Sequence, residues 1–296
     1  MTVKEKFAYA SLHPYALALH LLVQIAFGMF LMHPVVVSIS LFFSIVMCLN
    51  VYGKKFLKEL RIYLPFYLIV ALANPLFSHN GATPLFFMNG RPITYEAAVY
   101  GFVSAGMFLS ILLWCHVWSG VMTEDKLLYL IGRRFPKIGL VLSVTLRMIP
   151  RFVDKWREIG EAQATLGGTR RKVFDKIKNA LRMFSALITQ AMESSVETGM
   201  SMAARGYGLP GRKDFVRYRF RKSDLIFVCV NIALMIFLIV TIAQGTFAFN
   251  FYPHVSNPDR SLLAIAAYSA FFIQSSMLFL LQMKEEVVWT YSQSRI

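Results

Sequence analysis

The chain has 296 residues, of which 56% are hydrophobic and only 16% are charged, and its formal net charge is +15. Soluble domains carry charges on about 25% of their residues. The composition therefore excludes an ordinary soluble domain and predicts a membrane protein whose positive charges are concentrated in particular segments.

The N-terminal part is one long apolar stretch. Residues 7–53 contain no Asp, Glu, Lys or Arg, and His33-Pro34 interrupts them. One transmembrane helix needs only about 20 residues, so the stretch predicts a helical hairpin. A cleaved signal peptide would instead have one short apolar core followed by a small-residue cleavage site.

Apolar segments further along the chain complete the predicted membrane domain. The expected spans are residues 15–33, 35–52, 62–78, 96–119, 224–248 and 261–283, and the second of them is short. The predicted fold class is thus all-α, a polytopic membrane protein with about six transmembrane helices and long amphipathic cytoplasmic helices. We divide the chain into N-terminal membrane helices (1–118), a cytoplasmic region (119–223) and C-terminal membrane helices (224–296).

Lysine and arginine are distributed unevenly between the two sides of this predicted membrane domain. Of the 31 basic residues, 29 fall on one side, among them Lys54, Lys55, Lys58 and Arg61 in the loop expected after the second span. Only Arg91 and Arg260 fall on the other side. The positive-inside rule then predicts a multi-pass protein of the cell membrane, with both termini and residues 119–223 in the cytoplasm.

Ionisable and metal-ligating residues give little sign of chemistry inside the membrane. The spans lack interior acids, lysines and arginines, which argues against a proton- or sodium-driven carrier. The cysteines are isolated and no two histidines have ligand spacing, so we expect no disulfide, no metal site and no cofactor. The remaining polar residues in the spans are expected to form hydrogen bonds between helices: Gln24, Asn74, Asn231 and Gln244.

The loop between the third and fourth spans, residues 74–101, is rich in turn residues around an apolar strip. It is expected to link the two spans, and its segment ATPLFFMNGRPIT has the pattern of a small hairpin. Thr94 is a suitable N-cap for the fourth span, where the helix dipole favours the anionic Glu96.

Residues 119–223 read as three helices: about 123–132, then 136–166 with a kink near Pro150, then 169 or 170 to 205. The third is amphipathic. Its predicted apolar face comprises Val173, Ile177, Ala180, Leu181, Phe184, Leu187, Ile188, Ala191, Met192, Ser195, Gly199, Met202 and Ala203. This face requires an apolar cover: the second helix, the membrane surface or another membrane protein.

Arg205 lies at the predicted end of the third helix, between Ala204 and Gly206. With such small neighbours, its guanidinium can enter a pocket and bind carboxylates in bidentate fashion. Alternatively, Arg205 only complements the negative end of the helix dipole beside a glycine stop.

The chain resembles the T component of energy-coupling factor (ECF) transporters, a subclass of ABC importers. The segment AMESSVETGMSMAARGYG resembles the family's second coupling-helix end, with its Ala-Arg-Gly triplet. The segment LRMIPRFVDKWREIGEAQATLGG resembles the first coupling helix, and NPLFSHNGATPLFFMNGRPIT resembles the outer loop. The resemblance covers most of residues 60–210.

The resemblance implies a non-catalytic scaffold that couples two cytoplasmic ATPases to a membrane substrate-binding subunit, the S component, for vitamin or metal-ion uptake. It assigns ATPase coupling to Ala204, Arg205 and Gly206, and to Thr165, Leu166 and Gly167, where Leu166 replaces the family's arginine. It assigns the S component to the face that includes Phe184, Leu187, Ile188, Ala191, Ser195 and Gly199. Two unlike ends predict a heterodimeric ATPase pair, unless Arg170 or Arg171 takes the missing role.

Other functions fit the sequence less well. A conventional ABC importer permease is the main alternative, because EAQATLGGTRRKVFDKI partly matches its cytoplasmic loop, but the Leu-Pro expected after Ile177 is absent. The sequence has no P-loop motif, and its acids are scattered, which disfavours an enzyme. The positive-inside bias accounts for most of the basic charge, so we expect the lipid bilayer and no nucleic acid as a partner.

Overall fold

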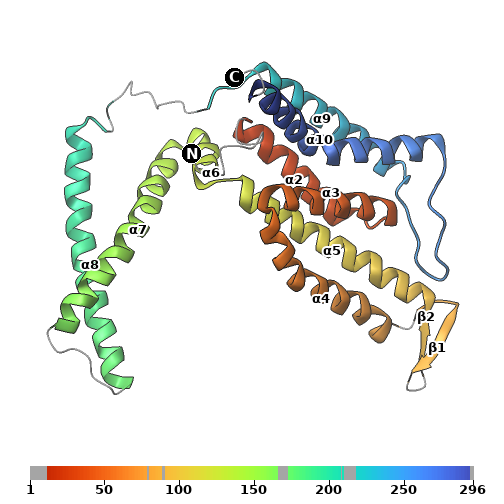
Figure 1. Cartoon of the computed structure of the whole chain (residues 1–296), viewed down its shortest axis with the longest axis horizontal. Helices are drawn as coiled ribbons and strands as arrows, with labels where there is room; N and C mark the ends of the chain where they lie inside the picture. Colours follow the sequence, from red (N-terminus) through yellow and green to blue (C-terminus); the bar gives the residue numbers. More distant parts are fainter. Residues whose placement is uncertain are drawn as a thin grey trace. The chain divides into compact units, whose positions relative to one another are not determined.

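The computed structural model describes residues 12–78, 80–88, 91–165, 173–207, 209 and 218–293. Within these ranges the chain forms nine helices and one two-stranded hairpin (Figure 1), so the predicted all-α class is confirmed. The chain divides into two compact units: residues 1–127 with 218–296, and residues 128–217.

The first unit contains the predicted membrane helices. They are α2 (Pro14–Phe30), α3 (Pro34–Tyr52), α4 (Lys54–Phe77), α5 (Tyr95–Val121), α9 (Lys222–Ala243) and α10 (Leu262–Gln293). Five can cross a membrane by length and composition, α10 through its Leu262–Lys284 part, whereas α2 has only 17 residues. The short apolar helix is therefore the first and not the second, because α2 ends at Phe30 and leaves residues 31–33 outside both helices.

Two boundaries differ from the sequence prediction. The basic residues expected in a loop, Lys54 to Arg61, form the first turns of α4, because Gly53 alone, with a φ of 58°, separates α3 from α4. The fifth span also ends earlier than predicted, at Ala243, and is followed by Gly245 with a φ of 76°. A single glycine with positive φ is thus enough to redirect the chain at each place.

The bundle has a continuous apolar core. Helix α5 packs against α2, α3 and α4, and α10 packs against α3 and α9. A side chain at Gly101 of α5 would lie only 2.4 Å from the Ala71 carbonyl oxygen of α4, so this glycine permits close helix contact. One buried cluster joins α2, α3, α9 and α10 and comprises Val23, Phe27, Leu31, Val36, Leu238, Phe247, Ala267, Ala270 and Phe271.

Buried polar side chains connect helices within this unit. Gln24 of α2 accepts a hydrogen bond from Ser275 of α10 at 3.2 Å, and Asn231 of α9 accepts one from Gln274 at 2.6 Å. The predicted role of Gln24 and Asn231 is therefore confirmed. The prediction for Gln244 is wrong, because α9 ends before it and its side chain is exposed.

The loop between α4 and α5 forms the hairpin that its sequence pattern suggested. Strands β1 (Pro84–Met88) and β2 (Arg91–Thr94) pair antiparallel, with an irregularity between Pro84 and Phe86. Thr94 caps α5 as predicted, since its hydroxyl accepts a hydrogen bond from the backbone N–H of Ala97.

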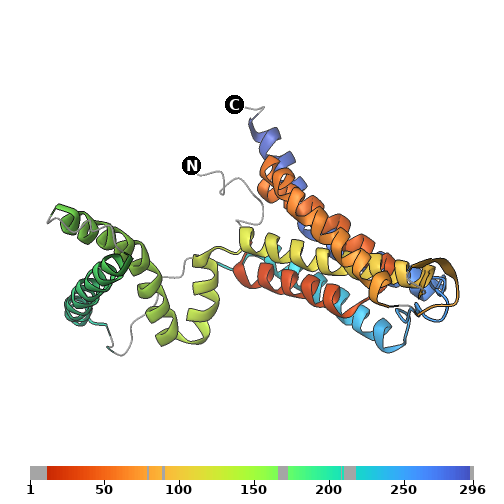
Figure 2. The same ribbon diagram turned by 90° about the horizontal axis from the view of Figure 1, so that it is seen from below.

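The second unit consists mainly of α7 (Pro136–Thr165) and α8 (Val173–Ala204), preceded by the C-terminal part of α6 (Glu124–Arg134). The three helices expected in residues 119–223 are thus confirmed, with boundaries close to those predicted. The ribbon of α7 bends along its length in Figure 2, in keeping with the proline, Pro150, inside this helix.

Candidate coupling surface

Helices α7 and α8 run antiparallel and cross each other (Figure 1). A side chain at Gly160 of α7 would lie 3.0 Å from the terminal methyl carbon of Met183 on α8, so a glycine permits close contact here. Because the helices are antiparallel, their C-terminal ends, at Thr165 and Ala204, lie at opposite ends of the pair.

Beyond this contact the two helices enclose a groove of about 220 Å³. Its apolar part comes from Met148 and Phe152 of α7 and from Leu187 and Ala191 of α8. Its polar part comes from both helices: Arg151, Lys155, Gln190, Ser194, Glu197 and Thr198.

The structure divides the predicted apolar face of α8 into two parts. Leu187 and Ala191 turn towards α7 and line the groove, where they are half-buried. Phe184, Ile188, Ser195 and Gly199 are exposed, and a side chain at Gly199 would meet no other atom within 4 Å. The second helix therefore covers only part of the face.

A longer apolar stripe continues from the exposed part along most of α8. Its members are between 45% and 78% exposed: Phe174, Ile177, Leu181, Phe184, Ile188, Met192, Val196 and Met200. The sequence prediction omitted Phe174, Val196 and Met200. The signal for the last two was available, because they continue from Met192 at intervals of four residues, which lie on one side of a helix.

The C-terminal end of α8 explains why Gly206 follows Arg205. The N–H of Tyr207 donates to the Met202 carbonyl oxygen at 3.1 Å, and that of Gly206 donates to the Ala203 carbonyl oxygen at 3.0 Å. With Gly206 at a φ of 75°, these bonds form a Schellman motif, which suits a glycine because its left-handed backbone disfavours a Cβ.

This cap leaves Arg205 at the last position before the turn. Its side chain is exposed, and no described side chain pairs with the guanidinium. Both interpretations made from the sequence therefore fit the geometry: Arg205 faces the carboxyl end of the helix and is free to bind a carboxylate elsewhere.

The corresponding end of α7 is described only up to Thr165. This side chain is exposed, and its hydroxyl donates to the Ala162 carbonyl oxygen at 2.7 Å. The other two predicted coupling residues of this end, Leu166 and Gly167, lie outside the described residues, as do Arg170 and Arg171.

The surface of α7 and α8 carries an ion pair as well as the apolar stripe and the arginine end. The ion pair between Lys155 and Glu158 of α7, at 2.7 Å, is exposed, so its contribution to stability is at most about 1 kcal/mol. Among the residues that the structure describes, no group of three His, Cys, Asp or Glu side chains is arranged to hold a metal ion. The prominent features are the apolar stripe and the arginine end.

Comparison with known proteins identifies relatives of the whole N-terminal and central part of the chain. A family model described as CbiQ, cobalt transport protein, matches residues 10–215. That match includes the first membrane helices, the hairpin and both crossed helices, and it reaches past Arg205.

Curated relatives match over a shorter segment. The energy-coupling factor transporter transmembrane protein EcfT of Listeria innocua is 33% identical over 103 residues, which cover 34% of this chain and 38% of that protein. The EcfT of Lactococcus lactis is 28% identical over 107 residues, covering 35% and 40%. That of Thermotoga maritima is 24% identical over 106 residues, covering 35% and 39%. The chain thus matches less than half the length of each of these relatives.

Proposed function

The chain belongs to the CbiQ family, and we propose that it is the transmembrane coupling subunit, or T component, of an ECF-type ABC importer. It is a non-catalytic subunit that transmits the ATP-driven motion of two cytoplasmic ATPases to a membrane substrate-binding S component, for uptake of a vitamin or a metal ion. The family match favours this function over that of a conventional ABC importer permease.

The observation that carries the proposal is the combination of two unlike surfaces on one helix. The stripe on α8 exposes eight large apolar side chains, which is unfavourable in water and favours a protein or membrane partner. The same helix ends in Arg205, a charged fork suited to a carboxylate on a soluble partner. A subunit that joins a membrane protein to a cytoplasmic ATPase needs both surfaces.

Each part of the predicted site has a role in this proposal. The end formed by Ala204, Arg205 and Gly206 docks one ATPase, and the end formed by Thr165, Leu166 and Gly167 docks the other. The opposite positions of the two helix ends support two separate docking points. The face that includes Phe184, Leu187, Ile188, Ala191, Ser195 and Gly199 receives the S component.

Charge reversal at Arg205 tests the ATPase contact. In the Arg205→Glu variant, the new carboxylate faces an acidic pocket, at a cost of several kcal/mol, on the order of other interface charge reversals. We expect co-purification of at least one ATPase with the tagged chain to be lost. Arg182→Glu, the same reversal at an exposed position within α8, should leave co-purification intact.

The result is interpretable only if the variant folds. Because Arg205 is exposed, the thermal unfolding of the detergent-solubilised chain should change little. If the Arg205→Glu complex assembles and transports like the unmodified complex, Arg205 is only a helix cap and the proposed contact is wrong.

The unlike ends of the two coupling helices give a second test. Truncation of a buried apolar contact at Leu166 costs about 1–3 kcal/mol, less than the loss of one partner of a buried charge pair. Leu166→Ala should therefore weaken ATPase co-purification less than Arg205→Ala. A homodimeric ATPase, or a larger loss from Leu166→Ala, would overturn the heterodimer proposal.

The S-component face is tested by neighbouring substitutions on α8. Ile188 belongs to the exposed stripe. Thr189 is exposed as well, but it is the next residue and therefore points about 100° away around the helix axis. Ile188→Asp should release the small membrane partner and keep the ATPases, and Thr189→Asp should release neither. Equal effects of the two substitutions would argue against this face.

The orientation rests on the distribution of basic residues. In a chain without its three native cysteines, Asn80→Cys should react with a membrane-impermeant maleimide in intact cells. Lys178→Cys should react only after the membrane is opened. The reverse pattern would contradict the cytoplasmic placement of residues 119–223.

A further inference from the structure

The hairpin between α4 and α5 exposes apolar side chains on both of its faces. Phe86 pairs with Ile93, and Phe87 pairs with Pro92, so the two phenylalanines lie on opposite faces of the hairpin. Ile93 is buried, but Phe86 and Phe87 remain 55% and 71% exposed. Leu85, in the irregular part of β1, is exposed as well.

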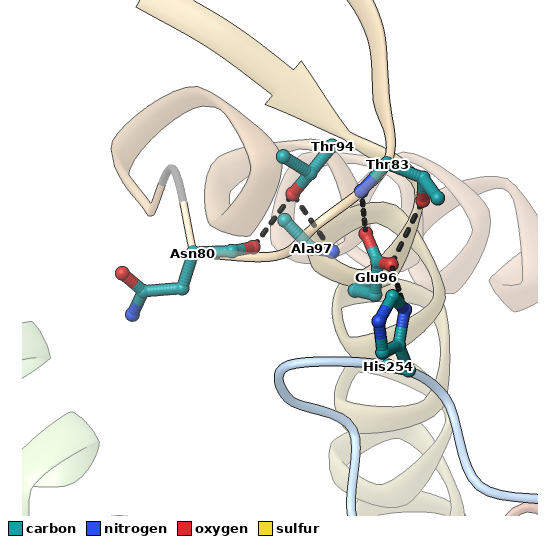
Figure 3. A network of polar contacts seen from close by, with 6 residues as sticks. All are labelled: Asn80, Thr83, Thr94, Glu96, Ala97 and His254. Atoms are coloured by element: carbon teal, nitrogen blue, oxygen red, sulfur yellow. Dashed lines mark hydrogen bonds and ion pairs between the residues drawn. The ribbon is translucent and has the colours of Figure 1, made fainter.

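A buried carboxylate fixes the base of this hairpin (Figure 3). Glu96, only 2% exposed in the first turn of α5, accepts hydrogen bonds from the Thr83 backbone N–H at 3.3 Å and from its hydroxyl at 2.8 Å. His254, from the segment between α9 and α10, lies 3.8 Å from the same carboxylate. The strand β1 is thus tied at its start to α5.

Further bonds around the base complete the attachment. The Thr94 hydroxyl donates to the Asn80 carbonyl oxygen at 2.6 Å, and the Ala82 N–H donates to the Pro253 carbonyl oxygen at 3.1 Å. Gly81, with a φ of 136°, has no room for a side chain, because a Cβ there would lie 2.6 Å from a Glu96 oxygen. The base therefore has a defined conformation, and the apolar strand projects from it.

The hairpin lies at the ends of two membrane helices. It is attached to α4, which ends at Phe77, and to α5, which begins at Tyr95, and both helices are long and apolar enough to cross a membrane. In Figure 1 the strands turn away from the axis of α5 and do not continue it. If α4 and α5 cross a bilayer, a hairpin that turns away from their axis can run along the membrane surface.

Exposed aromatic side chains mark the same end of the bundle. Phe77, the last residue of α4, is 87% exposed, and Tyr95, which directly follows β2, is 51% exposed. Aromatic residues are enriched where membrane proteins pass from hydrocarbon to headgroups. These two side chains therefore support an interfacial depth for the hairpin.

The backbone of the hairpin sets a limit on how deep it can lie. An isolated two-stranded hairpin is marginally stable in water, so its apolar faces need a cover. Its outer edges carry backbone groups that hydrocarbon cannot satisfy, although Pro84 and Pro92 bring no N–H to them. The boundary between headgroups and acyl chains meets both requirements.

We propose that the β1–β2 hairpin is a lipid-binding element that lies in the bilayer interface, with Leu85, Phe86 and Phe87 among the acyl chains and its base among the headgroups. The occupant of its apolar surface is the lipid itself. The proposal depends on α4 and α5 crossing a bilayer and not on the ATPase or S-component contacts, so it stands or fails separately from the proposed function.

The experiment is spin labelling of the full chain, reconstituted in vesicles of phosphatidylethanolamine and phosphatidylglycerol. Phe87→Cys is introduced after replacement of Cys48, Cys115 and Cys229, and collisions of its label with oxygen and with a water-soluble nickel chelate are measured. Ile236→Cys, exposed on α9, serves as the lipid reference, and Asn257→Cys, exposed in the segment before α10, serves as the water reference.

We expect the ratio of oxygen to nickel collisions at position 87 to shift to the value at position 236. A ratio equal to that at position 257 would show a hairpin surrounded by water, and low collision with both reagents would show a cover made of protein. Either result overturns the proposal. Leu85→Cys, measured in the same way, decides the question if the Phe87 variant does not reconstitute.

Discussion

Many large apolar side chains are buried in the membrane bundle, whereas those of the crossed helices α7 and α8 are mostly exposed. In the bundle, Trp114 and Phe271 are fully buried, and the six helices α2, α3, α4, α5, α9 and α10 pack against one another. None of the described side chains of α8 is buried, and in α7 only Gly139 is. The bundle buries many of its large apolar side chains within the chain, whereas the crossed helices leave most of theirs on the surface.

Polar contacts also differ between the bundle and the crossed helices. In the bundle, Asn231 lies 2.9 Å from the His20 ring and accepts a bond from Gln274, so three helices share one buried cluster. On α7, the ion pair of Lys155 and Glu158 joins two exposed residues of a single helix. The polar contacts of the buried cluster connect different helices of the bundle, whereas this ion pair connects two residues on the surface of α7 alone.

The largest expected effect comes from removing matched aromatic side chains in the two regions. Trp114→Ala opens a cavity in the bundle and leaves Ser40 without the 3.0 Å bond from the indole N–H, so we expect a loss of about 3–5 kcal/mol. Phe184→Ala on α8 removes a side chain that is already 55% exposed, so its effect should stay within about 0.5 kcal/mol. Unfolding of the detergent-solubilised chain measures both.

Equal losses from these two substitutions would contradict the comparison. They would mean that α8 buries Phe184 within the isolated chain, and that its exposed stripe is not a surface for a partner.

An intermediate effect is expected in the polar cluster. Asn231→Leu removes the acceptor of the Gln274 amide and the partner of His20, and leaves both groups unpaired in the bundle interior. We expect destabilisation of about 1–3 kcal/mol. Asn50→Leu is the matched control, because the Asn50 amide nitrogen has no partner to lose.

The result would be read from thermal unfolding of both variants under the same conditions. If Asn231→Leu is as stable as the unmodified chain, the cluster does not hold α2, α9 and α10 together, and the contrast with the crossed helices is weaker than we infer.

The smallest expected effect separates two glycines of the α8 region. Gly206 needs its positive φ, so Gly206→Ala should destabilise the end of α8 by about 1 kcal/mol, on the order of the cost of a left-handed residue. Gly199 lies within the helix with free space around it, so Gly199→Ala should stabilise α8 by about 0.5–1 kcal/mol. Hydrogen exchange of the α8 amides reports both changes.

The essential outcome is that the two substitutions change the stability of α8 in opposite directions. If Gly206→Ala leaves the exchange of the last turn unchanged, the Schellman cap is not what positions Arg205, and the helix end must be fixed by a partner.

The features that could be predicted from sequence depend on local signals. Thr94 was recognised as a cap because a hydroxyl before an apolar run satisfies a free N–H, and the end of α8 was recognised because a glycine follows the last helical turn. The spans followed from apolar length alone. Such signals need no knowledge of distant residues.

The features that were missed depend on long-range packing or on a single backbone angle. Lys54 and its neighbours look like a polar loop, yet one turn at Gly53 lets them begin α4. The division of the α8 face, with Leu187 turned inwards and Ile188 left outside, depends on where α7 crosses, and helix periodicity does not specify this. The assignment of coupling roles to Arg205, Leu166 and the α8 face stays a prediction.

Two glycines let α6 and α7 meet closely at the corner between them. At Gly139 a side chain would lie 2.4 Å from the Cα of Gly132, so the backbones of α6 and α7 are in direct contact there. No side chain of either glycine separates the two helices at this corner. The 30 residues of α7 extend about 45 Å along the helix path. A rotation of about 10° at Gly139 would move the far end of α7, about 39 Å further along the helix, by roughly 7 Å, more than one helical turn. A small rotation at this corner would therefore produce a large displacement of the C-terminal end of α7.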